Sequence, residues 1–183
     1  MSAACLLLML LPLVSGQTYH WGPCPSPKVQ PNFRIQQYQG KWYEIEKLPA
    51  TFERGKCIEA NYALRSDSTI RVQNSQFYKD KVRTIEGTAV ILDPRQPAKL
   101  GVSFSYFTPY SPYWILTTDY FSLAVVYSCT DILRIFHVEY AWILGRSRFL
   151  PPQTVRYAKQ LLMSERIDVV RMKATDQTGC QGK

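Results

Sequence analysis

The sequence alternates between apolar and polar residues, with a period of two, in a long series of short segments between residues 42 and 144. Such alternation is typical of β-strands that bury one face, and residues common in turns separate the segments. The pattern predicts eight consecutive strands, at residues 42–48, 57–64, 69–78, 82–92, 100–107, 113–118, 123–129 and 132–144.

The period changes only after these strands, where one helix is expected. Pro151 and Pro152 open the segment 151–165 as prolines do in a first helical turn. Its apolar residues share one face: Val155, Ala158, Leu161 and Leu162. A further apolar–polar stretch, residues 167–172, is predicted as a ninth strand.

The connections between the predicted strands decide between two architectures. Short hairpins suit an up-and-down barrel, whereas a two-sheet sandwich with Greek keys needs a long crossing connection. We therefore expect an all-β fold, an eight-stranded antiparallel barrel over residues 40–145 with the C-terminal helix packed outside. The sandwich is the alternative.

The ends of the chain differ from its centre. Residues 1–16 hold no charged side chain and an apolar run too short to span a bilayer, followed by the small Ser15 and Gly16. We expect a secretory signal peptide there rather than a buried amphipathic helix, because no polar face exists. Residues 17–183 are then one extracellular domain, with a proline-rich irregular arm at 17–37 and a tail at 166–183.

The formal net charge of +8 permits anionic partners but does not require them. The basic residues are scattered along the chain rather than clustered. A solvated surface is the interpretation we favour, and no nucleic-acid partner is expected.

Four cysteines remain once Cys5 leaves with the signal: Cys24, Cys57, Cys129 and Cys180. In a secreted chain they imply two disulfides, for which three connectivities exist. A metal site is not expected, because no two of these cysteines are close in sequence, and His20 and His137 have no nearby His or Cys. His137 is expected on the outer or helix-facing side of its strand, with Glu139.

Three short motifs together resemble the signature regions of the lipocalins. They are Gly40-x-Trp42 on the first strand, Thr118-Asp119-Tyr120 between the sixth and seventh, and Arg146 after the eighth. Longer stretches also match, at residues 40–47, 112–116, 126–129 and 141–144, so the resemblance covers nearly all of the predicted mature chain.

The resemblance implies a barrel that carries small hydrophobic molecules and whose closed end is formed by these motifs. Trp42 caps that end and Arg146 stacks across it as a cation–π pair. The cysteine pattern of the similar family members would pair Cys24 with Cys129 and Cys57 with Cys180. The first bridge would hold the arm and the second the tail.

An eight-stranded barrel can hold one small ligand if its inward side chains leave space. The inward faces that we assign are mostly aromatic, which suits an apolar ligand with one polar end, and Tyr62 and Asn74 could orient that end. The alternative is that these side chains fill a solid core. The predicted ligand-binding residues are Tyr62, Asn74, Phe104, Tyr106, Tyr113, Phe136 and Trp142, with Val138 on the same face.

The connection at residues 107–114 is rich in aromatic side chains for a segment that should face water. Counting hairpins places it at the open end of the barrel, opposite Trp42. It is expected to gate the pocket or to contact a lipoprotein or membrane surface. The alternative is that it packs against the loop that holds Phe52. The residues concerned are Phe107, Tyr110, Tyr113 and Trp114.

The function expected from these features is that of a secreted carrier for a fatty acid, a steroid or a similar lipid, without cofactor or metal. An isomerase that uses a pocket cysteine, as some lipocalins do, is the alternative and would need a free thiol at Cys57. No Ser-His-Asp or paired-carboxylate arrangement stands out, so an enzyme is not expected.

Overall fold

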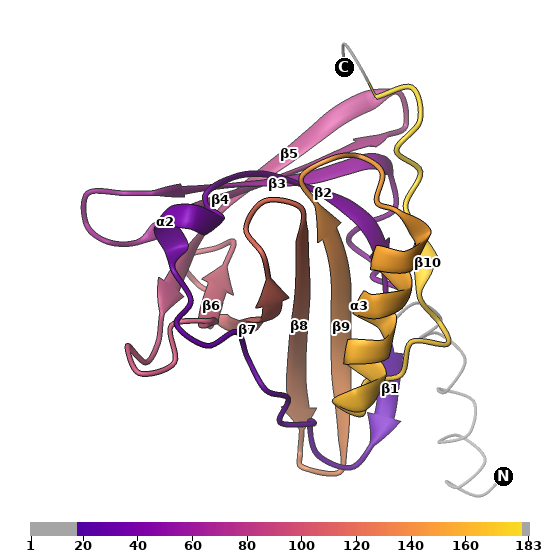
Figure 1. The fold of residues 1–183 in the computed structure, drawn as a ribbon. Helices are drawn as coiled ribbons and strands as arrows, with labels where there is room; N and C mark the ends of the chain where they lie inside the picture. The colour runs from indigo at the N-terminus through magenta and orange to yellow at the C-terminus, as the bar shows by residue number, and fades with distance from the viewer. Residues whose placement is uncertain (1–17, 181–183) are drawn as a thin grey trace, which may run out of the picture.

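The computed structural model describes residues 18–180, so the predicted signal peptide lies outside the described residues. Its centre is a closed antiparallel barrel in which each strand pairs with the next along the chain and the last returns to the first. Figure 1 shows this arrangement. The barrel strands are β2 (Gly40–Lys47), β3 (Lys56–Leu64), β4 (Ile70–Tyr78), β5 (Lys81–Ile91), β6 (Lys99–Ser103), β7 (Ser111–Thr118), β8 (Leu123–Ile132) and β9 (Phe136–Gly145). The predicted eight-stranded barrel is confirmed.

Two short strands extend the sheet beyond the barrel. β1 (Thr18–Trp21) pairs with the first residues of β9, and β10 (Lys173–Ala174) pairs with the last residues of β2. The arm is therefore less irregular than predicted, since it holds β1 and the short helix α2 (Ile35–Tyr38). The ninth strand predicted at 167–172 is wrong: these residues lie in turns and irregular chain, and β10 follows them.

Two barrel strands are shorter than predicted. The strand predicted at 132–144 begins only at Phe136, because Ile132 ends β8 and residues 133–135 form the turn. The strand predicted at 100–107 is also too long. The apolar alternation runs from residue 100 to 107, but pairing with β5 ends at Ser103, opposite Thr88. Residues 104–110 leave the sheet and connect β6 to β7 at the open end. Alternation alone does not show where the neighbouring strand stops offering hydrogen bonds.

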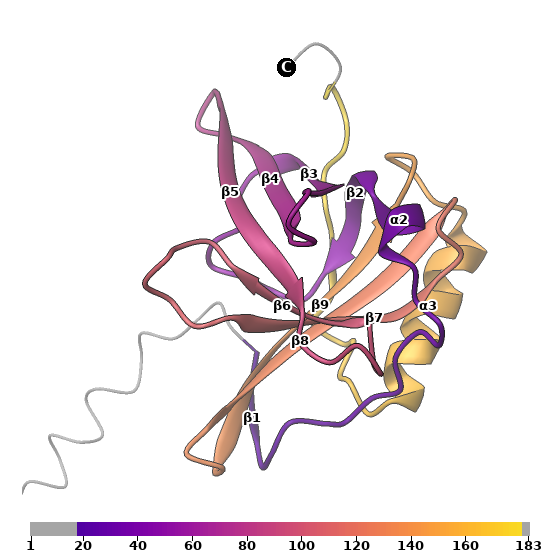
Figure 2. The ribbon, with the colours of Figure 1, turned by 90° about the vertical axis from the view of Figure 1, so that its left-hand side faces the viewer.

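The helix α3 (Pro152–Ser164) lies outside the barrel, as predicted, and both views show it beside the sheet (Figures 1 and 2). Ala158 and Leu162 are fully buried against the outer face of β8 and β9, where Val125, Ala141 and Ile143 are also buried. β8 is consequently buried on both faces. The helix thus stabilises the barrel from outside and leaves the lumen free.

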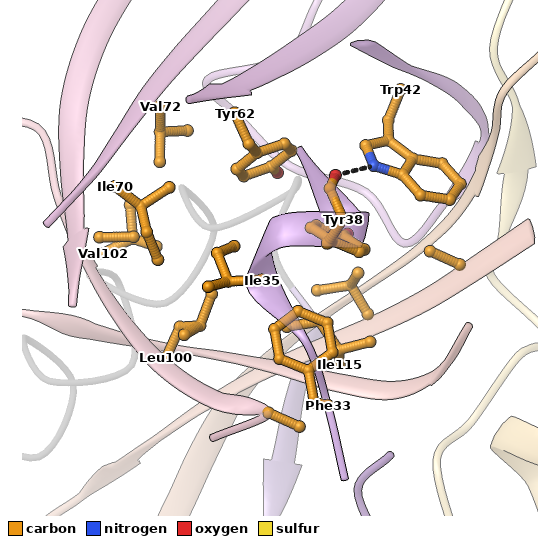
Figure 3. Close-up of a cluster of buried hydrophobic side chains, with 14 of the residues drawn as sticks. Phe33, Ile35, Tyr38, Trp42, Tyr62, Ile70, Val72, Leu100, Val102 and Ile115 are labelled. Carbon is orange, nitrogen blue, oxygen red and sulfur yellow. Dashed lines mark hydrogen bonds between the residues drawn. The ribbon is translucent and has the colours of Figure 1, made fainter. Parts of the chain in front are cut away.

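The segment between β1 and α2 runs along one side of the barrel and ends at its closed end (Figure 2). The amide of Gln30 donates to Ile115 O at 2.9 Å, and its side-chain oxygen accepts from Thr118 N at 2.9 Å. Ile35 and Tyr38 of α2 join the inner core cluster with Trp42, Tyr62 and other inward residues (Figure 3). The arm therefore closes one end of the barrel.

Both disulfides implied by the resemblance are confirmed. Cys24 pairs with Cys129 and Cys57 with Cys180, across 105 and 123 residues of sequence. The second bridge fixes the tail where β2 and β3 diverge. There Gln177 Nε2 donates to Glu44 O and to Ile58 O, each at 2.8 Å, so the tail joins the two strands.

Within residues 18–180, none of the helices combines the length and the apolar character that crossing a membrane requires.

Candidate functional site

The barrel encloses a cavity of about 480 Å³ between the Trp42 end and the open end. This volume is in the range of pockets that hold small organic ligands. Five of the predicted ligand-binding residues line it: Tyr62, Asn74, Phe104, Tyr113 and Trp142. The structure contradicts the alternative that these side chains fill a solid core, because they line an open cavity.

Aromatic side chains form much of the cavity wall. Tyr113 lies between Tyr62 and Trp142, with ring centres 6.0 and 6.2 Å away. The hydroxyl oxygens of Tyr62 and Tyr113 are 2.5 Å apart, and that of Tyr38 is 3.5 Å from that of Tyr113. Burial raises the pKa of Tyr62 and of Tyr113, so these hydroxyls stay uncharged and offer neutral hydrogen bonds.

Two predicted ligand-binding residues, Tyr106 and Phe136, do not line the cavity, and neither does Val138 on the same predicted face, so these assignments are corrected. Tyr106 is fully exposed, because β6 ends at Ser103 and the chain has left the sheet. Phe136 and Val138 lie in the part of β9 that pairs with β1 rather than with β2. Phe136 contacts Tyr19 instead, with ring centres 6.4 Å apart.

The sequence did not predict a cluster of charged side chains at the cavity wall, formed by Glu44, Lys47 and Glu53. Lys47 Nζ lies 3.1 Å from Glu44 Oε1 and 3.4 Å from Glu53 Oε2, and Trp142 Nε1 donates to the same Glu53 oxygen at 3.0 Å. Burial, together with the Glu53 carboxylate, raises the pKa of Glu44 to about 8, although Lys47 opposes the shift. At this place the cavity wall therefore holds the Glu53 carboxylate and a Glu44 carboxyl group that is largely protonated at neutral pH, and both engage Lys47.

The sequence carries a signal for part of this cluster, since Glu44 shares its period-two face with Trp42. A register shift between Glu44 and Glu46 then sends Glu46 to the outer face, where it lies 2.6 Å from Lys159 of α3. Glu53 comes from the loop after β2. Glu53 reaches Lys47 only through the folded path of this loop, and an alternating pattern of residues does not predict the path of a loop.

Trp42 and Arg146 close the far end. Trp42 is fully buried, donates from Nε1 to Tyr38 O at 2.9 Å, and has the Arg146 guanidinium carbon 3.8 Å from its ring centre (Figure 3 shows the Trp42–Tyr38 bond). Gly40 has φ +90° and an added Cβ would lie 3.4 Å from Arg146 Nη1. Glycine at position 40 therefore allows the backbone turn, whereas a Cβ there would meet the guanidinium only in ordinary van der Waals contact.

Thr118-Asp119-Tyr120 shapes the loop that supports Arg146. Asp119 Oδ1 accepts from the amides of Phe121, Ser122 and Leu123 at 2.8–3.0 Å. Desolvation opposes ionisation of Asp119, but these hydrogen bonds outweigh it and lower its pKa. The resulting turn presents Tyr120 O to Arg146 Nε at 3.0 Å. The six predicted barrel-closing residues thus gather at one end.

The aromatic residues predicted at the open end separate into three environments. Phe107 is 96% exposed and Tyr110 is 46% exposed. Tyr113 instead faces the cavity, and Trp114 lies on the outside of β7 with Lys99 Nζ 4.5 Å above its ring. The assignment of Tyr113 to a lipid-contacting surface is therefore corrected, whereas that of Trp114 stays a prediction.

His137 lies on the outer face of β9 with Glu139, as expected, but it is buried rather than at the surface. Its Nδ1 lies 2.9 Å from Gly22 O, and its ring stacks on His20 at 5.4 Å. Across the described part of the chain, no group of three or more His, Cys, Asp or Glu side chains is placed to hold a metal ion. Cys57 is bridged, so the isomerase alternative lacks the free thiol that it needs.

The chain is similar to known proteins along almost its whole length. A family model described as a lipocalin-like domain matches residues 33–177. Apolipoprotein D of Cavia porcellus is 50% identical over 179 residues, covering 96% of this chain and 95% of the relative. Apolipoprotein D of Oryctolagus cuniculus is 48% identical over 182 residues, covering 95% and 96%.

Solved structures agree with this relationship. The structure of insecticyanin from the tobacco hornworm Manduca sexta matches with a TM-score of 0.76 and 29% identity, over 88% of this chain and 89% of that one. Fold, closed-end geometry, cavity and sequence similarity point the same way. The chain belongs to the lipocalin family.

Proposed function

We propose that this protein is a secreted carrier that binds one small hydrophobic ligand in the barrel cavity, as in apolipoprotein D-like lipid transport. One observation carries the proposal: a cavity of about 480 Å³ with walls of aromatic and aliphatic side chains. Water in such a space loses hydrogen bonds, so an apolar guest replaces it favourably. The similarity to apolipoprotein D supports the same function.

The expected affinity follows from the apolar area that a ligand can bury. Burying roughly 300 Å² contributes about 7 kcal/mol at about 25 cal/mol per Å². Losses of translational and rotational freedom reduce this gain, so a dissociation constant on the order of 1 μM is expected. A fatty acid, a steroid or a similar lipid has suitable dimensions.

Secretion is supported by the two disulfides, because such bridges persist in oxidising compartments. The charge-free apolar start of the sequence also supports export.

Contact with a lipoprotein or membrane surface is a second part of the proposal, and the exposure of Phe107 and Tyr110 at the open end favours it. Exposed aromatic rings partition readily into lipid interfaces. Flotation with phosphatidylcholine vesicles tests this: Phe107→Ser should reduce the bound fraction. Phe121→Ser is the matched control, since Phe121 is 82% exposed in the β7–β8 connection at the closed end. Equal flotation of the two variants would contradict the contact.

The carrier function is tested by titrating the protein with N-phenyl-1-naphthylamine, a neutral apolar probe whose fluorescence rises in dry sites. Trp142→Ala should weaken binding by about tenfold, because it removes a cavity wall. Trp21→Ala is the control, since Trp21 is exposed outside the barrel and should bind the probe as the wild type does. No saturable binding, or equal binding by both variants, would refute the proposed site. Mass spectrometry of lipids extracted with the natural protein would then identify the ligand.

A further inference from the structure

The cavity is lined by acidic side chains and by no cationic one among the described residues. The protein carries a net charge of +8, yet none of the described residues that line the cavity is Lys, Arg or His. Three glutamates line it instead: Glu44, Glu53 and Glu59. The lining thus has the opposite electrostatic character to the protein as a whole.

Glu59 does not present its carboxylate to a ligand. Its two oxygens are held by Lys41 Nζ at 2.7 Å and by Arg148 Nη2 at 3.3 Å. Those partners are absent from the lining, so only its remaining atoms contribute to the wall. Glu53 is therefore the carboxylate that gives this wall its negative charge, since burial raises the pKa of the neighbouring Glu44 to about 8 and keeps it largely protonated at neutral pH.

The cation next to them has no donor to spare. The three hydrogens of the Lys47 ammonium face three acceptors: Glu53 O at 2.8 Å, Glu53 Oε2 at 3.4 Å and Glu44 Oε1 at 3.1 Å. Only 12% of the Lys47 side chain is exposed. The Trp142 indole N–H is also engaged, with Glu53. An incoming carboxylate would meet the Glu53 carboxylate on this wall and no available cation.

A second, independent group has the same preference. Asn74 Oδ1 on β4 is buried and has no hydrogen-bond partner, although Asn74 lines the cavity. A buried carbonyl oxygen without a partner costs free energy that a ligand's donor can recover. Asn74 on β4 and Glu53 in the loop after β2 lie in different elements, and each presents an oxygen that accepts a hydrogen bond.

From these contacts we infer that the cavity selects hydrophobic ligands whose polar end donates a hydrogen bond and carries no negative charge. This inference rests on the proposed carrier function and narrows its ligand class. Long-chain alcohols, hydroxysteroids, amides and amines fit the acceptors on the wall. A fatty acid fits when it enters as the neutral acid, whose hydroxyl donates to Glu53 or Asn74, and its anion is disfavoured.

The effect of the polar end is isolated by comparing three ligands that share the same hydrocarbon chain: tetradecanol, tetradecylamine and tetradecanoate. Each is titrated below its micelle concentration against bound N-phenyl-1-naphthylamine at pH 7.4. The alcohol and the amine should displace the probe at concentrations about tenfold lower than tetradecanoate, because a carboxylate within several ångströms of Glu53 is repelled. Tetradecanoate should bind more tightly as the pH is lowered toward 5.

A variant pair locates the cause. Glu53→Gln should reduce the preference for alcohol over carboxylate by about tenfold, since it removes one negative charge from the wall. Glu46→Gln is the matched control on β2, because Glu46 faces Lys159 outside the barrel, and it should keep the wild-type ratio. The ratio is the readout, so a general loss of affinity or stability does not imitate the result.

The outcomes separate the two proposals. If the probe does not bind at all, the carrier function fails and the inference fails with it. If the probe binds but tetradecanoate displaces it as well as tetradecanol at pH 7.4, the carrier function survives and the inference is overturned. An unchanged ratio in Glu53→Gln also overturns it.

Discussion

The guanidinium carbon of Arg146 lies 3.8 Å from the centre of the Trp42 ring, and this pair closes the barrel. Burial lowers the pKa of Arg146, and hydrogen bonds to backbone oxygens compensate the charge. Nη1 donates to Lys41 O at 2.8 Å and Nη2 to Gln39 O at 2.9 Å. The pair therefore joins α2, β2 and the segment after β9, which are far apart in sequence.

Replacing Trp42 should mainly destabilise the fold. Trp42→Ala removes a fully buried indole from the closed end and should lower the free energy of unfolding by about 3–5 kcal/mol. Urea denaturation with intact disulfides measures this, and Trp21→Ala serves as the exposed control. A loss below about 1 kcal/mol in Trp42→Ala would contradict the role of Trp42 as a packed cap.

The buried Glu44 should make stability depend on pH. Its pKa rises from an ordinary value of 4.5 to about 8 on folding, so the folded state binds the proton more tightly than the unfolded state. Its contribution is complete below pH 4.5 and is lost as the pH rises toward and through 8. The slope cannot exceed about 1.4 kcal/mol per pH unit for one group.

This dependence is isolated by comparing the wild type with Glu44→Gln at each pH. The difference in free energy of unfolding, wild type minus variant, should fall steadily between pH 5 and pH 8. A flat difference, or one that increases with pH, would show that Glu44 is not held protonated by its surroundings.

Removing the Cys57–Cys180 disulfide, which holds the tail, should lower the free energy of unfolding because this bridge closes a long loop. The Cys57–Cys180 bridge spans 123 residues, and the loss of such a loop costs about 4–5 kcal/mol in the chain-entropy account. The double variant Cys57→Ser/Cys180→Ser should show this decrease in chemical denaturation. It should also show faster hydrogen exchange of the backbone amide at position 57, which in the wild type donates to Asp176 O in the tail. Unchanged exchange there would mean that the tail docks without the bridge.

The barrel could be predicted from the sequence because alternation and turn residues are local signals. The ends of the strands could not be predicted, since a strand ends where its neighbouring strand stops pairing with it. Phe104 and Tyr106 continue the alternation of β6, but β5 no longer pairs with them. The closed end could be predicted from the sequence through Trp42 and Arg146. The hydrogen bonds of these two residues with α2 could not be predicted, because no local pattern indicated that helix.

The cavity wall could likewise be predicted only in part from the sequence. Tyr62, Tyr113 and Trp142 line the cavity as their strand faces predicted. The cluster of Lys47 with Glu53 depends on a register shift in β2 and on the path of the following loop. Both are consequences of tertiary packing, which overrides a simple period of two.

The central claim, that the lumen itself holds the ligand, is tested most directly by filling it. Ala60 lines the cavity, whereas the next residue of β3, Asn61, is exposed. N-phenyl-1-naphthylamine should bind the wild type and Asn61→Trp with one site per chain, and Ala60→Trp should abolish binding while the variant stays folded by circular dichroism. Wild-type binding by a folded Ala60→Trp variant would contradict the account.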